Sequence, residues 1–196
     1  STGEVFESGF VITTNINDNI IYGSQTLVNT VFGSLANDTI TGGIADDTFY
    51  GNEGDDIFSA GLGDDLVEGG DGNDTLDYSL ITNQNGIGVD ANLVSGIVTG
   101  DGTDTVSEIE NITGTQSNDI LRGDASVNIL KGESGSDTLF GETGDDTLEG
   151  GDGNDTLVGG LGEDIIDGVL YDGVDIDNQG GDTNGKGYYA SVWKNV

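Results

Sequence analysis

The segment Gly144–Val158 reads GDDTLEGGDGNDTLV, and close copies of it recur at Gly54–Phe58 (GDDIF) and Gly69–Asp77 (GGDGNDTLD). Gly and Asp dominate this phrase, although both residue types are unfavourable in the interior of helices and strands. A phrase that recurs in spite of such residues indicates a constraint other than a hydrophobic core.

The phrase repeats every nine residues, in five consecutive nonads over 33–77 and six over 114–167. The first place is Gly except at Ala60, the sixth is Asp except at Asn128, and the eighth is always apolar. We expect the last three residues of each nonad to form a short strand that turns the eighth residue inward. The eighth-place residues are Ile40, Phe49, Phe58, Val67, Leu76, Leu121, Leu130, Leu139, Leu148, Leu157 and Ile166.

The first six residues of each nonad are expected to form a turn. Gly at the first, second and fourth places permits positive φ and a close approach of neighbouring backbone. Such a turn directs carbonyl oxygens into one small space, and the sixth-place Asp adds a carboxylate to it. A flexible cage made only of oxygen ligands suits a hard cation, and calcium in particular.

The composition excludes several classes of function. The chain of 196 residues has 37 acidic and only 4 basic residues, a formal net charge of −33. Such a charge repels phosphates, so we expect no nucleic-acid partner. His and Cys are absent, which excludes disulfides, imidazole and thiolate metal ligands, and the commonest general base. Each carboxylate of the repeats already has a metal to bind, so we expect no catalytic residue.

The sequence shows no targeting or membrane segment. No apolar run approaches the roughly 18 residues that a membrane span requires. The first residues, STGEVFESGF, lack the basic and apolar regions of a signal peptide. The sequence begins with Ser1 rather than Met, so we expect it to be part of a longer protein.

The nonads resemble the RTX calcium-binding nonapeptide, Gly-Gly-x-Gly-x-Asp-x-apolar-x. The resemblance implies an all-β fold, a right-handed parallel β-roll (a β-solenoid) in which two nonads make one turn. It also implies that each Ca²⁺ lies between one nonad and the next but one. The first nonad supplies its second- and fourth-place carbonyls, the later one its first- and third-place carbonyls, and each adds its Asp. About seven ions are expected on this pattern.

Carried over residue by residue, the pattern gives three complete sites. The first joins the carbonyls of Asn52, Gly54, Gly69 and Asp71 to the carboxylates of Asp56 and Asp74. The second joins Glu133, Gly135, Gly150 and Asp152 to Asp137 and Asp155. The third joins Glu142, Gly144, Gly159 and Leu161 to Asp146 and Asp164.

Weaker sites are expected where Ala or Ser replaces the fourth-place Gly. The carboxylate pairs are Asp38 with Asp56, Asp47 with Asp65, and Asp119 with Asp137, and the carbonyls of Gly51 and Glu53 belong to the first of them. The weakest would pair Asn128 with Asp146 beside the carbonyls of Gly141 and Thr143, because Asn128 has lost one carboxylate.

Five segments are expected along the chain. They are a degenerate cap (1–32), a first array (33–77), a calcium-free β spacer (78–113), a second array (114–167) and a C-terminal cap or tail (168–196). The spacer is four nonads long, so we expect one continuous solenoid. In that frame Leu76, Val94, Ile112 and Leu130 all face the core.

The resemblance implies a calcium-binding structural module of a bacterial protein exported by a type I machine, either secreted or held at the cell surface. We expect the module to be monomeric and to fold when calcium binds outside the cell. Two kinds of parent protein remain open, a surface adhesin and a secreted enzyme such as a protease, lipase or polysaccharide-modifying enzyme. Any surface or carbohydrate partner would be bound through that parent protein. The flanking sequence distinguishes the two kinds of parent protein, because tandem Ig-like repeats favour an adhesin and a catalytic motif favours an enzyme.

Overall fold

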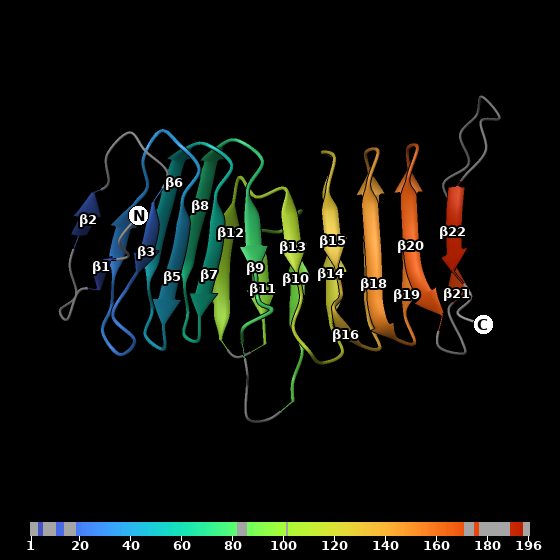
Figure 1. Ribbon diagram of the computed structural model, residues 1–196, viewed down its shortest axis with the longest axis horizontal. Helices are drawn as coiled ribbons and strands as arrows, with labels where there is room; N and C mark the ends of the chain where they lie inside the picture. The colour runs from blue at the N-terminus through green and yellow to red at the C-terminus, as the bar shows by residue number, and fades with distance from the viewer. Residues whose placement is uncertain are drawn as a thin grey trace. The chain divides into compact units, whose positions relative to one another are not determined.

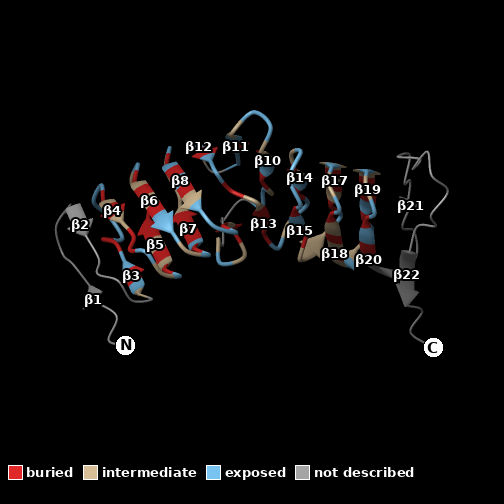
Figure 2. Cartoon of the chain, turned by 90° about the horizontal axis from the view of Figure 1, so that it is seen from above, coloured by how far each residue is buried: buried red, intermediate tan, exposed pale blue. Residues whose placement is uncertain are grey.

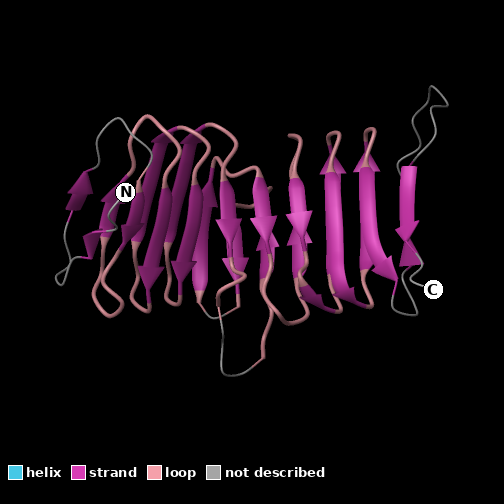
Figure 3. Cartoon of the chain, viewed as in Figure 1, coloured by secondary structure: helices cyan, strands magenta, loops and turns pink. Residues whose placement is uncertain are grey.

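The computed structural model describes residues 4–5, 11–13, 19–81, 86–100, 102–170, 175–176 and 189–193. Every regular element in these ranges is a β-strand, as Figure 3 shows. No helix in the described part of the chain could cross a membrane. The all-β class predicted from the sequence is confirmed. The chain divides into two compact units, residues 1–81 with 96–109 and residues 82–95 with 110–196.

In the first unit, strands alternate between two sheets, so each strand of an array pairs in parallel with the next but one (Figure 1). One sheet holds β1 (Glu4–Val5), β3 (Ile20–Tyr22), β5 (Thr39–Gly43), β7 (Ile57–Gly61) and β9 (Thr75–Asp77). The other holds β2 (Val11–Thr13), β4 (Thr30–Phe32), β6 (Thr48–Glu53), β8 (Leu66–Asp71), β12 (Thr103–Ser107) and β11 (Ile97–Thr99). β12 is parallel to β8, whereas β11 is antiparallel to β12.

The second unit has the same alternating arrangement. One sheet holds β13 (Asn111–Thr113), β15 (Ile129–Lys131), β18 (Thr147–Gly153), β20 (Ile165–Leu170) and β22 (Tyr189–Trp193), with the short β16 (Ser134–Gly135) beside β18. The other holds β10 (Asp90–Asn92), β14 (Ile120–Arg122), β17 (Thr138–Thr143), β19 (Thr156–Leu161) and β21 (Asp175–Ile176). The parallel β-solenoid implied by the nonads is confirmed within each unit.

The register places eighth-place residues directly above one another. Ile40 pairs with Phe58 between β5 and β7, and Leu139 pairs with Leu157 between β17 and β19. Every eighth-place residue of both arrays is at most 2% exposed. Figure 2 shows the resulting bands, in which buried residues alternate with exposed ones along the strands. The core is therefore a column of single apolar side chains, as the nonad spacing predicts.

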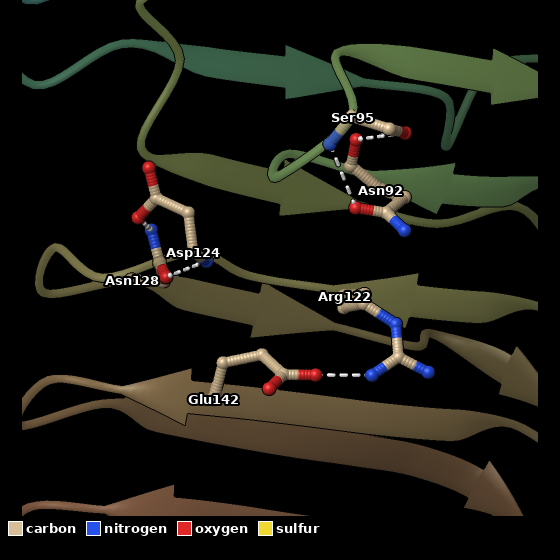
Figure 4. Close-up of polar contacts among 6 residues, drawn as sticks. All are labelled: Asn92, Ser95, Arg122, Asp124, Asn128 and Glu142. Carbon is tan, nitrogen blue, oxygen red and sulfur yellow. Dashed lines mark hydrogen bonds and ion pairs between the residues drawn. The ribbon is translucent and has the colours of Figure 1, made fainter.

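The nine-residue frame is not kept through the spacer, and the prediction for Val94 is wrong. Val94 is 68% exposed, because it lies in the turn after β10. Ser95 closes that turn by donating hydrogen bonds from its backbone N–H and Oγ to Asn92, at 3.1 and 3.2 Å (Figure 4). The expected core residue is replaced by others of the spacer, such as Ala91 and Val98, which are at most 1% exposed. A continuous solenoid through 78–113 stays a prediction. The expected cap and tail lie partly outside the described residues.

Replacing an eighth-place residue should destabilise the calcium-loaded chain strongly. Leu148→Ala removes a side chain that is 0% exposed and leaves a cavity. We expect the free energy of unfolding to fall by roughly 2–5 kcal/mol. Ile165, which lies in the seventh place and is 55% exposed, provides the matched control. Urea unfolding in saturating calcium measures both variants, and equal losses for Leu148→Ala and Ile165→Ala would contradict the single-column core.

Candidate metal site

The sixth-place residues form a buried ladder in each unit. Each is at most 4% exposed. One side-chain oxygen accepts the backbone N–H of the sixth-place residue 18 positions earlier, as in Asp38 N–H to Asp56 Oδ1 at 2.7 Å. The same bond joins Asp119 N–H to Asp137 Oδ1 at 2.8 Å in the second unit. This ladder fixes the carboxylates and leaves their second oxygens to be accounted for.

Many of these second oxygens are buried without any hydrogen-bond partner. They include the Oδ2 atoms of Asp56, Asp65, Asp137, Asp146, Asp155 and Asp164. A buried carboxylate oxygen that loses water and gains no donor or cation is unfavourable by at least the cost of a lost hydrogen bond, and by more when it is charged. The fold therefore demands either a proton or a cation at each of these oxygens.

Backbone carbonyls lie beside three of the partnerless oxygens, those of Asp56, Asp137 and Asp146. The point where a Cβ on Gly51 would stand is 2.2 Å from Asp56 Oδ2 and 2.2 Å from the carbonyl oxygen of Gly69, one turn along the solenoid. No residue but Gly fits such a first place without displacing one of the two oxygens. The same arrangement recurs at Gly132, with Asp137 Oδ2 at 2.4 Å and Gly150 O at 2.5 Å, and at Gly141, with Asp146 Oδ2 at 2.5 Å and Gly159 O at 2.4 Å. These are pairs that the sequence analysis assigns to one ion.

The same turns have a strained backbone at their second place. Asn52, Glu133 and Glu142 have φ of 79°, 73° and 76°, in the left-handed region that disfavours residues other than Gly. The fourth-place Gly54 is also left-handed, at φ 118°. Strain of this kind persists only where the surrounding structure imposes it, and it is common at ligand clamps. It falls on residues whose carbonyls are assigned to the metal. We refer to turns with this left-handed backbone at the second and fourth places as open turns.

The first turns of each array are closed by their own hydrogen bonds. In them Ala or Ser replaces the fourth-place Gly, and the second-place N–H donates to the sixth-place Asp. The bonds run from Ser34 to Asp38 Oδ2 at 2.5 Å, from Gly43 to Asp47 Oδ2 at 3.1 Å and from Thr115 to Asp119 Oδ2 at 2.7 Å. This bond is a physical reason to rank these positions as weaker ligands, because calcium must displace it.

Asn128 closes its turn most completely. Its Oδ1 accepts the N–H of Asp124 at 2.8 Å, and its Nδ2 donates to the Glu110 carbonyl at 2.7 Å. Asp124 and Asn128 face each other across the turn in Figure 4, which also shows the ion pair between Arg122 and Glu142. A side-chain amide thus supplies the positive end that a cation would otherwise provide.

The donor set favours calcium. In the described ranges no group of three or more acidic side chains is placed to hold a metal ion. Each open turn instead combines a carboxylate oxygen with neighbouring carbonyls, and calcium accepts such mixed oxygen ligands at 2.3–2.6 Å. The residues present therefore fit Ca²⁺ better than metals that prefer nitrogen or sulfur.

The model of the RTX calcium-binding nonapeptide repeat (4 copies) matches residues 27–58, 50–79, 105–139, 113–148 and 140–168. The chain belongs to the RTX calcium-binding nonapeptide repeat family. A solved structure, the extracellular lipase LipA from Serratia marcescens, is 20% identical over 85% of this chain and 39% of its own, with a TM-score of 0.35. No curated protein matches the sequence.

One residue of the RTX ladder, Asp104, lies outside the nine-residue frame and was not predicted from the sequence. Its Oδ1 accepts the N–H of Asp65 at 3.0 Å, which is the ladder bond of a sixth-place Asp. The signal is present in the sequence, since Gly100–Val106 reads GDGTDTV and Gly70–Leu76 reads GDGNDTL. It was missed because this copy lies three residues out of the nine-residue frame and has Thr99 in place of the first Gly.

Burial raises the pKa of the RTX carboxyl groups. Loss of hydration is the main cause, and it raises the pKa of Asp56 and Asp137 to about 7 and that of Asp65 to about 8. Neighbouring carboxylates raise these values further, whereas the ladder N–H bonds lower them. Without a cation, the carboxyl groups of the folded chain therefore retain protons that the same groups lose in an unfolded chain.

Calcium loading should depend more on open turns than on closed ones. Asp137→Ala removes a partnerless oxygen and a carboxylate assigned to two ions, whereas Asp119→Ala removes an oxygen already bonded to Thr115. Titration calorimetry should therefore show a larger loss of bound calcium for Asp137→Ala. Equal losses would mean that ions are not shared between turns in this way.

Acid should partly replace calcium. An unfolded Asp titrates near pH 4, whereas the buried groups titrate between about 6 and 8. Their contribution to stability is complete below about pH 4 and is lost as the pH rises through 6 to 8. In chelator, the chain should therefore resist urea better at pH 5 than at pH 8. Greater resistance at pH 8, with calcium absent, would show that these carboxyls are not buried and partnerless in the folded state.

Proposed function

We propose that this chain is a non-catalytic calcium-binding module that folds when Ca²⁺ binds outside the cell, as part of a larger secreted or surface-attached bacterial protein. The observation that supports it is the set of buried carboxylate oxygens without a hydrogen-bond partner, of which those of Asp56, Asp137 and Asp146 each lie beside a backbone carbonyl of the next turn. One calcium ion contacts about six to eight oxygens at once, whereas a proton on a carboxyl joins it to a single carbonyl.

The proposed ligands are those of the three complete sites, centred on Asp56 with Asp74, Asp137 with Asp155 and Asp146 with Asp164. Calcium supplies the positive charge on which these oxygens converge. The pairs that begin with Asp38, Asp47, Asp119 and Asn128 would fill at higher calcium, because their turns are closed by internal hydrogen bonds. Together these pairs give about seven ions.

Folding should be coupled to binding because the chain has little else to stabilise it. Each nonad buries only one apolar side chain, while nine residues must be ordered, and Gly loses more backbone entropy on folding than any other residue. A formal charge of −33 opposes compaction further. Binding free energy then becomes folding free energy. The calcium concentration outside cells lies in the range to which extracellular modules are tuned.

Removing calcium should unfold the chain. Far-UV circular dichroism in excess chelator at neutral pH should show a largely disordered spectrum, and calcium at about millimolar concentration should restore a β-rich one cooperatively. Magnesium at the same concentration is the control, because it demands a small octahedral site and should restore little. A β-rich spectrum that persists unchanged in chelator would remove calcium from the account of this fold.

A further inference from the structure

Within the first unit, the segment Gly102–Val106 is built like a calcium turn. Its Asp104 lies 39 residues after Asp65, whereas regular partners in the ladder are 18 residues apart. Thr103 N–H donates to Asp64 Oδ1 at 2.9 Å, and Asp65 N–H donates to Asp104 Oδ1 at 3.0 Å. The regular turn ending at Asp74 makes the matching bonds, from Asn73 N–H to Asp55 Oδ1 at 3.0 Å and from Asp56 N–H to Asp74 Oδ1 at 2.8 Å.

The backbone contacts match as well. A Cβ on Gly102 would stand 1.9 Å from the carbonyl oxygen of Gly63, and a Cβ on Gly72 would stand 1.9 Å from that of Gly54. Thr105 N–H donates to the Asp65 carbonyl at 2.8 Å, in the parallel register that pairs Thr105 with Leu66. The second half of a regular turn is thus reproduced by a hairpin strand that arrives from outside the repeat.

We propose that a calcium ion binds between the turn Gly61–Asp65 and the half-turn Gly102–Asp104. This inference rests on the proposed function and assigns it a ligand set that the nonad frame does not contain. The ligands are the carboxylates of Asp65 and Asp104 and the second- and fourth-place carbonyls of Gly61 and Gly63.

Three observations point to a cation rather than to a simple acidic cluster. Asp65 is 3% exposed and its Oδ2 has no hydrogen-bond partner. The turn that contains it is open, since Gly61 and Gly63 have φ of 108° and 121°, as in the regular open turns. A second buried carboxylate, Asp104 at 6% exposure, is bonded to the same turn. Two buried carboxylates in this arrangement need positive charge between them.

Tyr78 distinguishes this site from the others. The half-turn at Gly102 is preceded by β11, which is antiparallel to β12. We therefore assign to this site none of the first- and third-place carbonyls that a regular nonad would supply. Tyr78, which is 2% exposed, instead donates its hydroxyl to Asp104 Oδ2 at 2.7 Å. The hydroxyl holds the carboxylate in place while the oxygen keeps a lone pair for the ion. With fewer carbonyl ligands, this site should fill at higher calcium than the complete sites.

Counting bound ions tests the proposal. In native mass spectrometry of the calcium-loaded chain, Asp104→Asn should bind one ion fewer than the wild type, because it keeps the acceptor for Asp65 N–H but loses a carboxylate. Asp64→Asn is the matched control, since it removes the same charge from the exposed neighbouring position and should leave the count unchanged. If the wild-type chain binds no calcium, the proposed function itself is wrong. A loaded wild type with the same count in Asp104→Asn would overturn only this site.

Terbium gives a second readout that does not depend on the fold of the Asp104 variant. Tb³⁺ at this site would lie next to Tyr78, so tyrosine excitation should sensitise its emission. Tyr78→Phe should lower that emission strongly, because it removes the tyrosine beside the ion, and Asp64→Asn should leave the emission unchanged. Emission that is the same in Tyr78→Phe and in the wild type would overturn the placement of the ion beside Asp104.

Discussion

A carboxylate oxygen buried without a donor is the constraint on which this structure depends. The open turns around Asn52, Glu133 and Glu142 each place one such oxygen beside a carbonyl of the turn stacked on it, as Asp56 Oδ2 and the Gly69 carbonyl illustrate. A core of single apolar side chains is too thin to outweigh both this penalty and the entropy of Gly-rich turns. On the proposed function, the fold becomes favourable when a cation joins these oxygens, and the repeat then serves metal binding as much as packing.

The difference between open and closed turns follows from one place in the nonad. At Gly54 the backbone takes positive φ, and Asp56 keeps an oxygen without a hydrogen-bond partner. Where the fourth place holds Ala36, the second-place N–H of Ser34 turns onto Asp38 instead. The first turns of an array can thus satisfy their own carboxylates, whereas later turns cannot. This gives each array an end that needs less metal.

The sequence predicts the strictly periodic features well and the exceptions poorly. The inward column through Leu139 and Leu157 and the buried ladder of Asp residues follow directly from a nine-residue period. Val94 was misplaced because a turn closed by Asn92 and Ser95 interrupts the period, and a frame carries no information on such local hydrogen bonds. Asp104 was missed for the opposite reason. Its phrase is present from Gly100 to Val106, but it follows the antiparallel strand β11 and so lies outside the nine-residue frame. The closing bond at Asp38 depends on backbone dihedrals that residue types only suggest.

The central claim is that calcium binding supplies the free energy of folding, and the dependence of stability on calcium tests it most directly. The free energy of unfolding should be measured by urea titration at a series of buffered free calcium concentrations. Each ion bound only by the folded chain adds about 1.4 kcal/mol for every tenfold rise in calcium above its dissociation constant. The account predicts a slope that corresponds to several ions. A free energy of unfolding that does not change with calcium would contradict it.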